Sequence, residues 1–444
     1  MNEVRQHLLS RLDSLSASAV TWRRDFHKYP EVAWTEFRTG SIVARRLLDM
    51  GGWEVIYGED LYDKSMMLGM PSQKELDEHA ARAIAQGGDP EIIAKMKGGY
   101  TGVLATLKTG DGDGPVVAFR VDIDANDLQE AQDEEHRPYA EGFSSQNPNA
   151  MHACGHDCHT AMGLLAAQAL LDARDMLPSG TIKIVFQTGE EGGRGGQPMA
   201  RAGIVDDADY FMAVHVGVGP DTRLGTIGCG VSNMSCSTKS DVTFTGIPAH
   251  AGGHPESGKN ALLASANAAI NLYAITRHSE GATRVNVGVL NAGVGRNVIA
   301  PNAYMKIETR GVTKSLNDFM SERAVSVIQG AAKMYGVDCS IVKTGETTSA
   351  PMDPEMVEIV ARSAAEIPGV EHVVRDVSMG GGGEDCTFFM LRIQERGGKA
   401  TMAIVSTSGA AVGHNSYFDV DEEVIAIGAK LISLVALNCL TQKQ

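Results

Sequence analysis

The sequence lacks the features of several large classes of protein. Positive charge is scarce, because 39 lysines and arginines stand against 55 aspartates and glutamates, giving a formal net charge of −16. This balance, without basic clusters, argues against a nucleic-acid partner. The seven cysteines are an odd number without the spacing of a disulfide framework. Reduced thiols in the cytoplasm are therefore expected.

Long apolar segments are also missing from the sequence. We find no run of membrane-spanning length, and the charged, amphipathic N-terminus MNEVRQHLLSRLDSL has no hydrophobic core of a secretory signal. We therefore expect a cytoplasmic protein that has no membrane partner. A chain of 444 residues, 43% hydrophobic and 21% charged, is globular and too long for a single core, so about two domains are expected.

The most informative segment that is present is MHACGHDCHT, residues 151–160, with three histidines, two cysteines and an aspartate. Thiolate and imidazole donors suit a transition metal such as zinc or manganese better than calcium or magnesium. These donors are too crowded along the chain to form the four ligands of one structural zinc ion. A cysteine nucleophile is an alternative, with Cys154 activated by His156 or His159, although no orienting third group is evident.

A catalytic metal site would take further ligands from the ends of several strands. Three apolar runs predict such strands: TIKIVFQT at 181–188, YFMAVHV at 210–216 and TMAIVST at 401–407. Glu190 and Glu191 follow the first, His215 lies near the end of the second, and His414 follows the third. A single strand-end histidine usually only packs, but several of them in an α/β pattern predict one shared site.

The middle of the chain predicts a second domain. The pattern is strand, helix, strand, strand, helix, strand, at 241–246, 259–277, 284–290, 304–311, 316–335 and 337–345. This order is that of a ferredoxin-like α+β fold, and candidate ligands lie on both sides of it. We therefore predict an α/β catalytic domain, residues 1–236 and 350–444, with a lid domain inserted at 237–349.

Two other segments carry less information. Residues 60–97 contain ELDEHAARAIA, which predicts an amphipathic helix between two strands of the catalytic domain. It either shapes the substrate pocket or packs outside it. The run GGGGEDC at 380–386 by itself predicts a flexible glycine turn before a helix, whereas its resemblance to a loop of a known family implies a position beside the active site.

The motifs together resemble a known family. RRDFHKYPE, FRVDIDA, MHACGHD, QTGEEGG, PAHAG and GHNSYFD, with the strand-end His215, resemble the amidohydrolases of the M20 metallopeptidase family over essentially the whole chain. The WRRDFH start, EEGGRGG, HSEGATRVNVGV and GRNVIAP resemble the branch that cleaves p-aminobenzoyl-glutamate, a folate breakdown product. The family implies a zinc-peptidase-like catalytic domain with a central mixed sheet, and a lid that is also the dimerisation surface.

The resemblance also implies two divalent metal ions, zinc or manganese, bridged by one protein ligand. The ligands it assigns are Cys154, His156, Glu191, His215 and His414. Cys154 would be the bridge, where many relatives have aspartate, and two cations would lower the pKa of its thiol. Glu190 would be the general base that moves a proton from water to the leaving amine. Asp122 and Asp124 would support the site from behind the ligands, the alternative being a solvated turn.

Residues of the predicted lid complete the implied site. His250 corresponds to a family histidine that reaches into the neighbouring subunit's site to stabilise an oxyanion, the alternative being a turn histidine without a role. A guanidinium pairs with a carboxylate through two hydrogen bonds. The candidates for holding a substrate carboxylate are Arg296, Asn297 and Arg310 of the lid, and Arg194, which lies beside the two glutamates in the catalytic domain. A surface position without a role is the alternative for each arginine.

The expected activity is therefore hydrolysis of p-aminobenzoyl-glutamate to p-aminobenzoate and glutamate, by a homodimer or by a heterodimer with a homologous subunit. An N-acyl-amino-acid amidohydrolase of broader specificity is the second possibility. An inactive binding subunit of the same fold would have lost Glu190 or a ligand, and this chain has lost none. A cysteine hydrolase that uses Cys154 would differ from a metal enzyme in resisting chelators.

Overall fold

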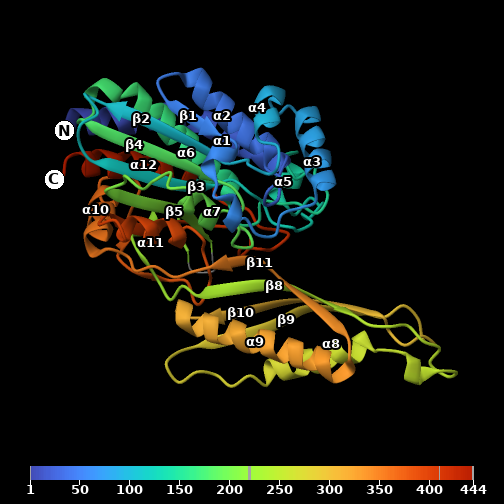
Figure 1. The fold of residues 1–444 in the computed structure, drawn as a ribbon. Coiled ribbons are helices and arrows are strands. Elements are labelled where there is room, and N and C mark those ends of the chain that lie inside the picture. Colours follow the sequence, from blue (N-terminus) through green and yellow to red (C-terminus); the bar gives the residue numbers. More distant parts are fainter. Residues whose placement is uncertain (1, 219–221, 410, 443–444) are drawn as a thin grey trace. The chain divides into compact units, whose positions relative to one another are not determined.

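The structure is a computed structural model that describes residues 2–218, 222–409 and 411–442. It divides into two compact units (Figure 1). Unit 1 comprises Met1–Ser232, Ala350–Met379 and Cys386–Gln444, and unit 2 comprises Asn233–Ser349 and Gly380–Asp385. The chain thus passes from unit 1 to unit 2 after Ser232, before the predicted boundary at 236/237. The loop 380–385 belongs to unit 2 rather than to the catalytic domain, because Glu384 bridges Thr348 and the Ser235 N–H donates to the Gly382 carbonyl.

A mixed eight-stranded sheet with the order β1-β2-β4-β3-β5-β14-β6-β12 forms the centre of unit 1. Its strands are β1 (Glu54–Tyr57), β2 (Val103–Thr109), β3 (Val116–Asp122), β4 (Gly180–Gln187), β5 (Tyr210–Val218), β6 (Thr226–Gly228), β12 (His372–Val374) and β14 (Lys399–Thr407). A separate short pair joins β7 (Val231–Ser232) and β13 (Val377–Ser378). Strands β4, β3, β5 and β14 run parallel, so their carboxyl ends meet at one edge of the sheet.

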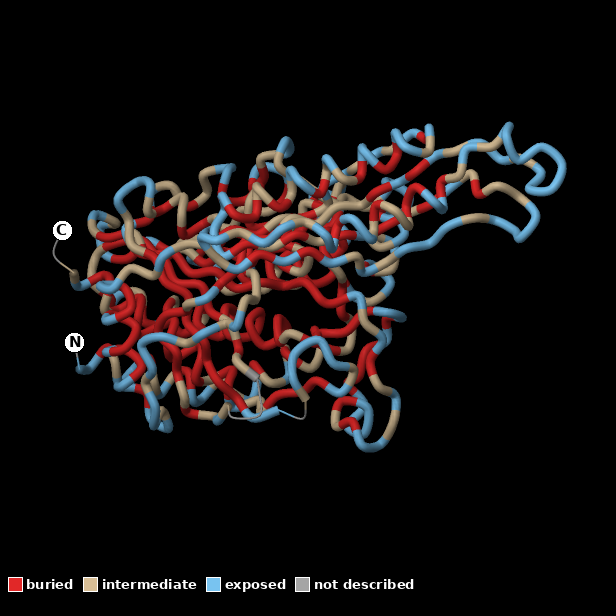
Figure 2. The backbone as a smooth tube through the Cα atoms, turned by 90° about the horizontal axis from the view of Figure 1, so that it is seen from below, coloured by how far each residue is buried: buried red, intermediate tan, exposed pale blue. Residues whose placement is uncertain are grey.

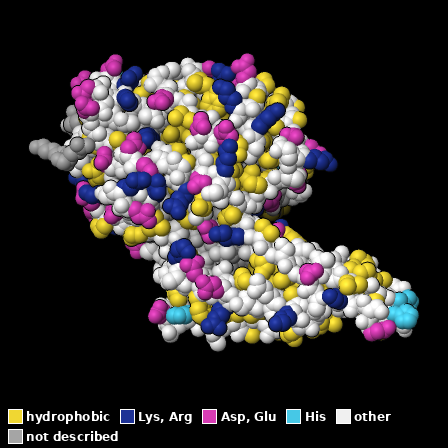
Figure 3. Space-filling view, in the orientation of Figure 1, with side chains coloured by type: hydrophobic (Ala, Val, Ile, Leu, Met, Phe, Trp, Pro, Cys, Tyr) yellow, Lys and Arg dark blue, Asp and Glu magenta, His cyan; other side chains and the backbone are white. Residues whose placement is uncertain are grey.

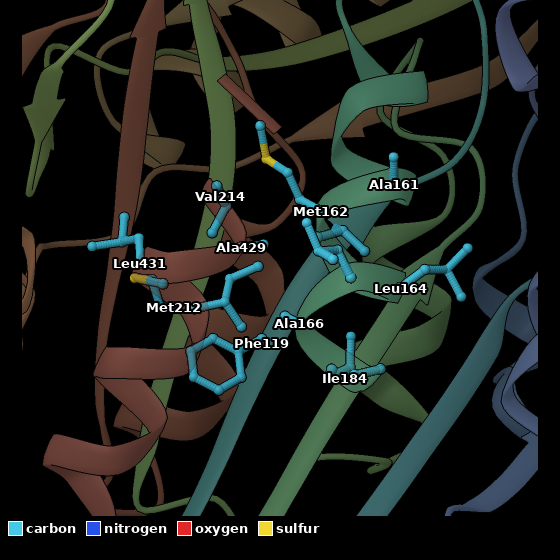
Figure 4. Packing of buried hydrophobic residues seen from close by; sticks show 14 of the residues in the cluster. Phe119, Ala161, Met162, Leu164, Ala166, Ile184, Met212, Val214, Ala429 and Leu431 are labelled. Carbon is cyan, nitrogen blue, oxygen red and sulfur yellow. The ribbon is translucent and has the colours of Figure 1, made fainter. Parts of the chain in front are cut away.

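Helices cover both faces of this sheet. They are α1 (Asn2–Lys28), α2 (Phe37–Met50), α3 (Gln73–Ala85), α4 (Pro90–Lys95), α5 (Arg137–Ala140), α6 (His156–Asp172), α7 (Gly196–Arg201), α10 (Pro354–Ala364), α11 (Thr387–Gln394) and α12 (Glu423–Leu440), with 3-10 turns at Glu59–Leu61, Lys64–Met66 and Arg174–Met176. Phe119 and Met212 of the sheet pack in one core cluster with residues of α6 and α12 (Figure 4). Side chains alternate across a strand, so Phe211 points the other way, where its ring stacks on Phe389 of α11 with centroids 5.9 Å apart.

Helix α12 corrects one expectation from the sequence. By length and composition it could cross a membrane, so the expectation that no apolar run reaches that length is wrong for residues 423–440. In the structure, 83% of this 18-residue window is buried, and α12 packs against α1, α6 and α10. Buried residues are concentrated in this core (Figure 2). A helix surrounded by other elements has no polar face to show in its sequence.

The predicted helix within 60–97 is confirmed as α3. A reciprocal cap fixes its start, because the Ser72 Oγ accepts the Glu75 N–H and the Glu75 carboxylate accepts the Ser72 N–H. Leu76 and Ala83 are its buried residues, which is the pattern of an amphipathic helix. It packs on α2 and α4, outside the central sheet.

Unit 2 has the β-α-β-β-α-β order that the sequence predicts. Its elements are β8 (Cys236–Thr245), α8 (Ala261–Tyr273), β9 (Thr283–Ala292), β10 (Asn302–Gly311), α9 (Lys314–Tyr335) and β11 (Asp338–Thr347), with a 3-10 turn at Pro255–Ser257. The four-stranded antiparallel sheet has the order β11-β8-β10-β9. Val242, Phe244 and Met305 of the sheet form one buried cluster with residues of both helices.

Candidate metal centre

The histidine- and cysteine-rich segment forms a turn and the first residues of α6. Gly155, with φ of 89°, makes this turn, and a Cβ there would come 2.3 Å from Val216 Cγ2. His156 is 1% exposed, and its Nδ1 lies 3.0 Å from the carbonyl oxygen of Asp124. Since a carbonyl can only accept, Nδ1 carries a proton, and in the neutral ring Nε2 is the nitrogen that presents a lone pair. The turn thus leaves Nε2 of His156 available to bind a metal ion.

Cys154 and His215 face each other at this edge of the sheet. Nδ1 of His215 donates to the Val216 carbonyl at 2.6 Å, and its Nε2 lies 3.4 Å from Cys154 Sγ. Burial opposes ionisation of the Cys154 thiol, but the charge of His215 and hydrogen bonds from the surrounding histidines outweigh it and lower the pKa to about 6. A thiolate, the form that binds metal ions, is therefore favoured at neutral pH.

Glu190 and Glu191 lie in the loop after β4, and Asp124 holds the backbone of both. Asp124 Oδ1 accepts the Glu190 N–H at 3.1 Å and Oδ2 accepts the Glu191 N–H at 2.9 Å. Nε2 of His414 lies 3.4 Å from Glu191 Oε1. Burial raises the pKa of Glu191, but the nearby His414 and His156 lower it to about 2. His414 itself has a left-handed φ of 62°, and Cys154 and Glu191 raise its pKa to about 10.

Two sets of donor atoms share the Cys154 sulfur. One joins it to nitrogens of His156 and His215, the other to Glu191 and His414, and the atoms of each set lie within 4.8 Å of one another. Among the described residues, His156 Nε2 and Glu191 Oε1 are buried and have no hydrogen-bond partner. A buried unsatisfied polar atom costs about 1–3 kcal/mol. Cations bound here would satisfy both atoms, and the sulfur, nitrogen and oxygen donors fit transition metals.

Asp122 and Asp124 are both fully buried, so the alternative of a solvated turn is wrong. Asp122 accepts from Arg120 Nη1 at 2.6 Å and lies 2.5 Å from His159 Nδ1. Nε2 of His159 accepts the Val216 N–H at 2.8 Å, so Nδ1 donates to Asp122. His159 thereby fixes the end of β5. Since both its nitrogens are engaged, it does not activate Cys154.

Sequence reasoning missed Glu36, which is fully buried. It lies under the loop after β4 that carries Glu190 and Glu191, the glutamate loop. Its Oε1 accepts the Gly189 N–H at 2.8 Å and lies 2.5 Å from Thr188 Oγ1, and its Oε2 lies 2.6 Å from Thr101 Oγ1. Together with Asp124, it binds three successive backbone N–H groups, those of residues 189–191. The sequence carries no signal for this role, because a single glutamate has no periodic pattern that could link it to hydrogen-bond partners so distant in the chain.

His250 lies exposed in the segment between β8 and α8 of unit 2. Its Nδ1 accepts the backbone N–H groups of Gly252 and Gly253 at 3.2 and 2.8 Å. The neutral ring therefore carries its proton on Nε2, where it can donate to a developing negative charge.

The predicted carboxylate-binding residues have different surroundings. Arg310 forms two hydrogen bonds with Glu308, at 2.8 and 3.0 Å, and one with the Gly381 carbonyl at 2.9 Å, so its donors are largely occupied. Arg296 and Asn297 are exposed in the turn between β9 and β10. Arg194 instead lines a pocket of about 300 Å³ in unit 1. The residues lining this pocket are Asn126, Asp127, Leu128, Glu191, Gly192, Arg194 and His414.

Comparison with known proteins identifies the class. Residues 118–438 match peptidase family M20/M25/M40. The chain is 46% identical, over 96% of its length and 97% of the relative's, to a subunit of the p-aminobenzoyl-glutamate hydrolase of Escherichia coli (strain K12). It is 47% identical, over 94% of each chain, to indole-3-acetyl-aspartic acid hydrolase of Enterobacter agglomerans. The chain belongs to peptidase family M20/M25/M40 and is a hydrolase that acts on amide bonds.

Solved structures agree with this assignment. An aminobenzoyl-glutamate utilization protein from Klebsiella pneumoniae superposes with a TM-score of 0.85 at 40% identity, covering 98% of this chain and 100% of that chain. A Bacillus subtilis M20 peptidase described as binding a dinuclear metal centre superposes with a TM-score of 0.66 at 24% identity, covering 96% and 99%. The second likeness shows the fold. The family and fold expected from the sequence motifs are confirmed.

Proposed function

We propose that this chain is a dimetal amidohydrolase that cleaves p-aminobenzoyl-glutamate to p-aminobenzoate and glutamate. The observation that carries the proposal is the sharing of Cys154 Sγ between one set of donors with His156 and His215 and another with Glu191 and His414. A deprotonated thiolate shared by the two sets can serve as the anionic bridging ligand of two adjacent cations. The substrate is supported by two relatives of 46% and 47% identity, both named for an aromatic acyl group joined to an acidic amino acid.

The five ligand residues would hold two divalent cations such as zinc or manganese. When bound, such ions polarise the scissile carbonyl and make water more acidic. Glu190 lies beside the ligand Glu191, and its Oε2 is 3.9 Å from His156 Nε2. In the proposed reaction, its carboxylate takes a proton from the attacking water and gives it to the leaving nitrogen. The water oxygen bonds to the carbonyl carbon, and the C–N bond breaks.

Unit 2 is the proposed lid and dimerisation domain. Helix α8, ALLASANAAINLY, has no charged residue, and Leu263, Ile270 and Tyr273 are 46%, 71% and 51% exposed. Apolar side chains are visible on the surface of unit 2 in Figure 3. Strand β9 is an edge of its sheet. An uncharged exposed helix and an open sheet edge favour association with a second copy or a homologous subunit. His250 would then donate its Nε2 proton to the oxyanion in that partner's site.

Release of p-aminobenzoate by the purified chain with added manganese or zinc tests this proposal. Glu190→Gln should reduce kcat by about 10²- to 10⁴-fold, the usual contribution of a general base, with unchanged metal content. The exposed Glu371→Gln is the matched control and should keep full activity. Chelator-resistant hydrolysis blocked by thiol alkylation would instead indicate a cysteine hydrolase. No release from metal-loaded protein, alone or mixed with a homologous subunit, would refute the substrate.

A further inference from the structure

Arg194 is held in place by the tight loop that also carries the two glutamates. The Gly189 carbonyl accepts the N–H groups of Arg194 and Gly195 at 3.0 and 2.8 Å. Gly192, with φ of 92°, makes room for the arginine, because a Cβ at this position would come 2.9 Å from Arg194 Nε and 3.4 Å from its Cζ. The absence of a side chain at residue 192 therefore lets the guanidinium fold back over the loop beside Glu191.

The guanidinium has no counter-ion within the described parts of the chain. Its Nε is buried and makes no hydrogen bond, and among the described residues Arg194 forms no ion pair. The fully buried Arg23 and Arg120 are paired with Asp157 at 2.7 Å and Asp122 at 2.6 Å, whereas Arg194, which is partly buried, has no carboxylate partner among the described residues. An arginine in a pocket with unused donors is prepared for an anion from outside. Its planar fork matches a carboxylate in two parallel hydrogen bonds.

From this arrangement we infer that Arg194 forms a subsite for the side-chain carboxylate of the leaving amino acid. The enzyme would thereby select N-acyl aspartates and glutamates over neutral N-acyl amino acids. This inference rests on the proposed amidohydrolase function. The pocket adjoins Glu191 and His414, so a group bound there lies next to the reacting amide.

The second carboxylate of the substrate is the informative one. Every N-acyl amino acid carries an α-carboxylate, so a site for that group cannot discriminate among amino acids. Aspartate and glutamate, the amino acids in the names of the two relatives, share a further carboxylate that neutral amino acids lack. A charge-assisted pair with arginine is worth about 1.5–3 kcal/mol. The expected preference for an acidic over an isosteric neutral amino acid is therefore about 10- to 100-fold.

Binding of a matched pair of ligands tests the inference without turnover. N-(4-aminobenzoyl)-L-glutamate and the isosteric N-(4-aminobenzoyl)-L-glutamine, which has the same α-carboxylate but an uncharged side chain, are titrated into metal-loaded Glu190→Gln protein by calorimetry, with and without Arg194→Met. The glutamate ligand should bind about 10- to 100-fold more tightly, and Arg194→Met should remove this preference by weakening that ligand alone. Arg194→Lys should keep part of it. Arg201→Met, at an exposed arginine ending α7, should change neither affinity.

Two results would overturn the inference. If Arg194→Met weakens the binding of both ligands equally, Arg194 binds the α-carboxylate or the substitution has disturbed the loop. If the unsubstituted Arg194 protein binds both ligands equally well, there is no preference for Arg194 to explain. A parallel hydrolysis assay with unsubstituted protein separates this inference from the proposed function. Hydrolysis of both amides at equal kcat/KM would leave the function standing and remove the subsite. An Arg194-dependent binding preference without any hydrolysis would leave the subsite standing and remove the function.

Discussion

Glu36 should tolerate glutamine but not alanine. Its two carboxyl oxygens and the hydroxyls of Thr101 and Thr188 form a closed ring, with contacts of 2.6, 2.9 and 2.5 Å. Three contacts need three hydrogens, and the two hydroxyls supply two, so the carboxyl group must supply the third. Burial, together with the charge of Asp124, raises the pKa of Glu36 to about 8. The group is therefore mostly neutral at pH 7, which is consistent with the ring.

Glutamine preserves this arrangement. Its amide N–H replaces the carboxyl O–H toward Thr101, and its oxygen still accepts from Thr188 and from the Gly189 N–H. We expect Glu36→Gln to cost at most about 1 kcal/mol of stability and to keep kcat. Alanine removes the acceptor of the Gly189 N–H and of one hydroxyl, at about 1–3 kcal/mol each, so the expected loss of stability is about 2–6 kcal/mol. Release of the loop would displace Glu190, and a shift of about 1 Å costs roughly 10²-fold in kcat.

Glu31 provides a matched control for the assay. It is also fully buried and accepts three hydrogen bonds, but from Arg38 N, Thr39 N and Thr39 Oγ1 at the start of α2, at 3.0, 2.8 and 3.0 Å. Glu31→Ala should lower Tm as Glu36→Ala does while leaving kcat unchanged. Tm, metal content and kcat for p-aminobenzoyl-glutamate are measured for all variants. The reasoning is refuted if Glu36→Gln lowers kcat as much as Glu36→Ala, or if neither alanine variant affects kcat.

Three further predictions concern pH, the loop and assembly. His27 lies between Asp157 and Glu130, at 2.8 and 2.9 Å, and although burial and Arg23 oppose its charge, the two carboxylates raise its pKa from 6.5 to about 9. The stabilisation from charged His27 is therefore complete below pH 6.5 and is lost as the pH rises through 9. Tm should thus fall more steeply between these pH values in the unsubstituted protein than in His27→Gln. Equal slopes of Tm against pH would contradict this prediction. Gly195→Ala puts a Cβ 1.7 Å from the Thr188 carbonyl oxygen and should lower kcat by about 10²-fold, because the clash displaces the glutamate loop. The control Gly330→Ala, in open space on α9, should keep kcat. A fully active Gly195→Ala enzyme would contradict the view that the position of this loop sets kcat. Ile270→Asp on α8 should dissociate the oligomer in analytical ultracentrifugation, while Met334→Asp, 69% exposed on α9, should not; an unchanged mass would remove α8 from the interface.

The strands and the clustering of candidate donor residues at their ends were predictable because their signals are local, whereas the family resemblance assigned the individual ligands. Runs of β-branched residues mark β4, β5 and β14, and parallel strands in an α/β pattern bring their ends together, so Glu191, His215 and His414 could be placed near the 151–160 segment from the sequence. The alternation of strands and helices likewise predicted the order of elements in unit 2. The family resemblance, not periodicity, distinguished Glu190 from Glu191.

Local patterns by themselves determined the main elements and the candidate donor residues that follow the strands of this protein. Only the tertiary structure decided that Glu36 and Asp124 bind the N–H groups of the glutamate loop, that His159 supports β5, and that α12 is a core helix. It alone showed that Arg194 has no carboxylate partner among the described residues. The physical reason is that each of these properties depends on contacts between segments distant in the chain, where burial and hydrogen-bond partners leave no periodic trace in either segment.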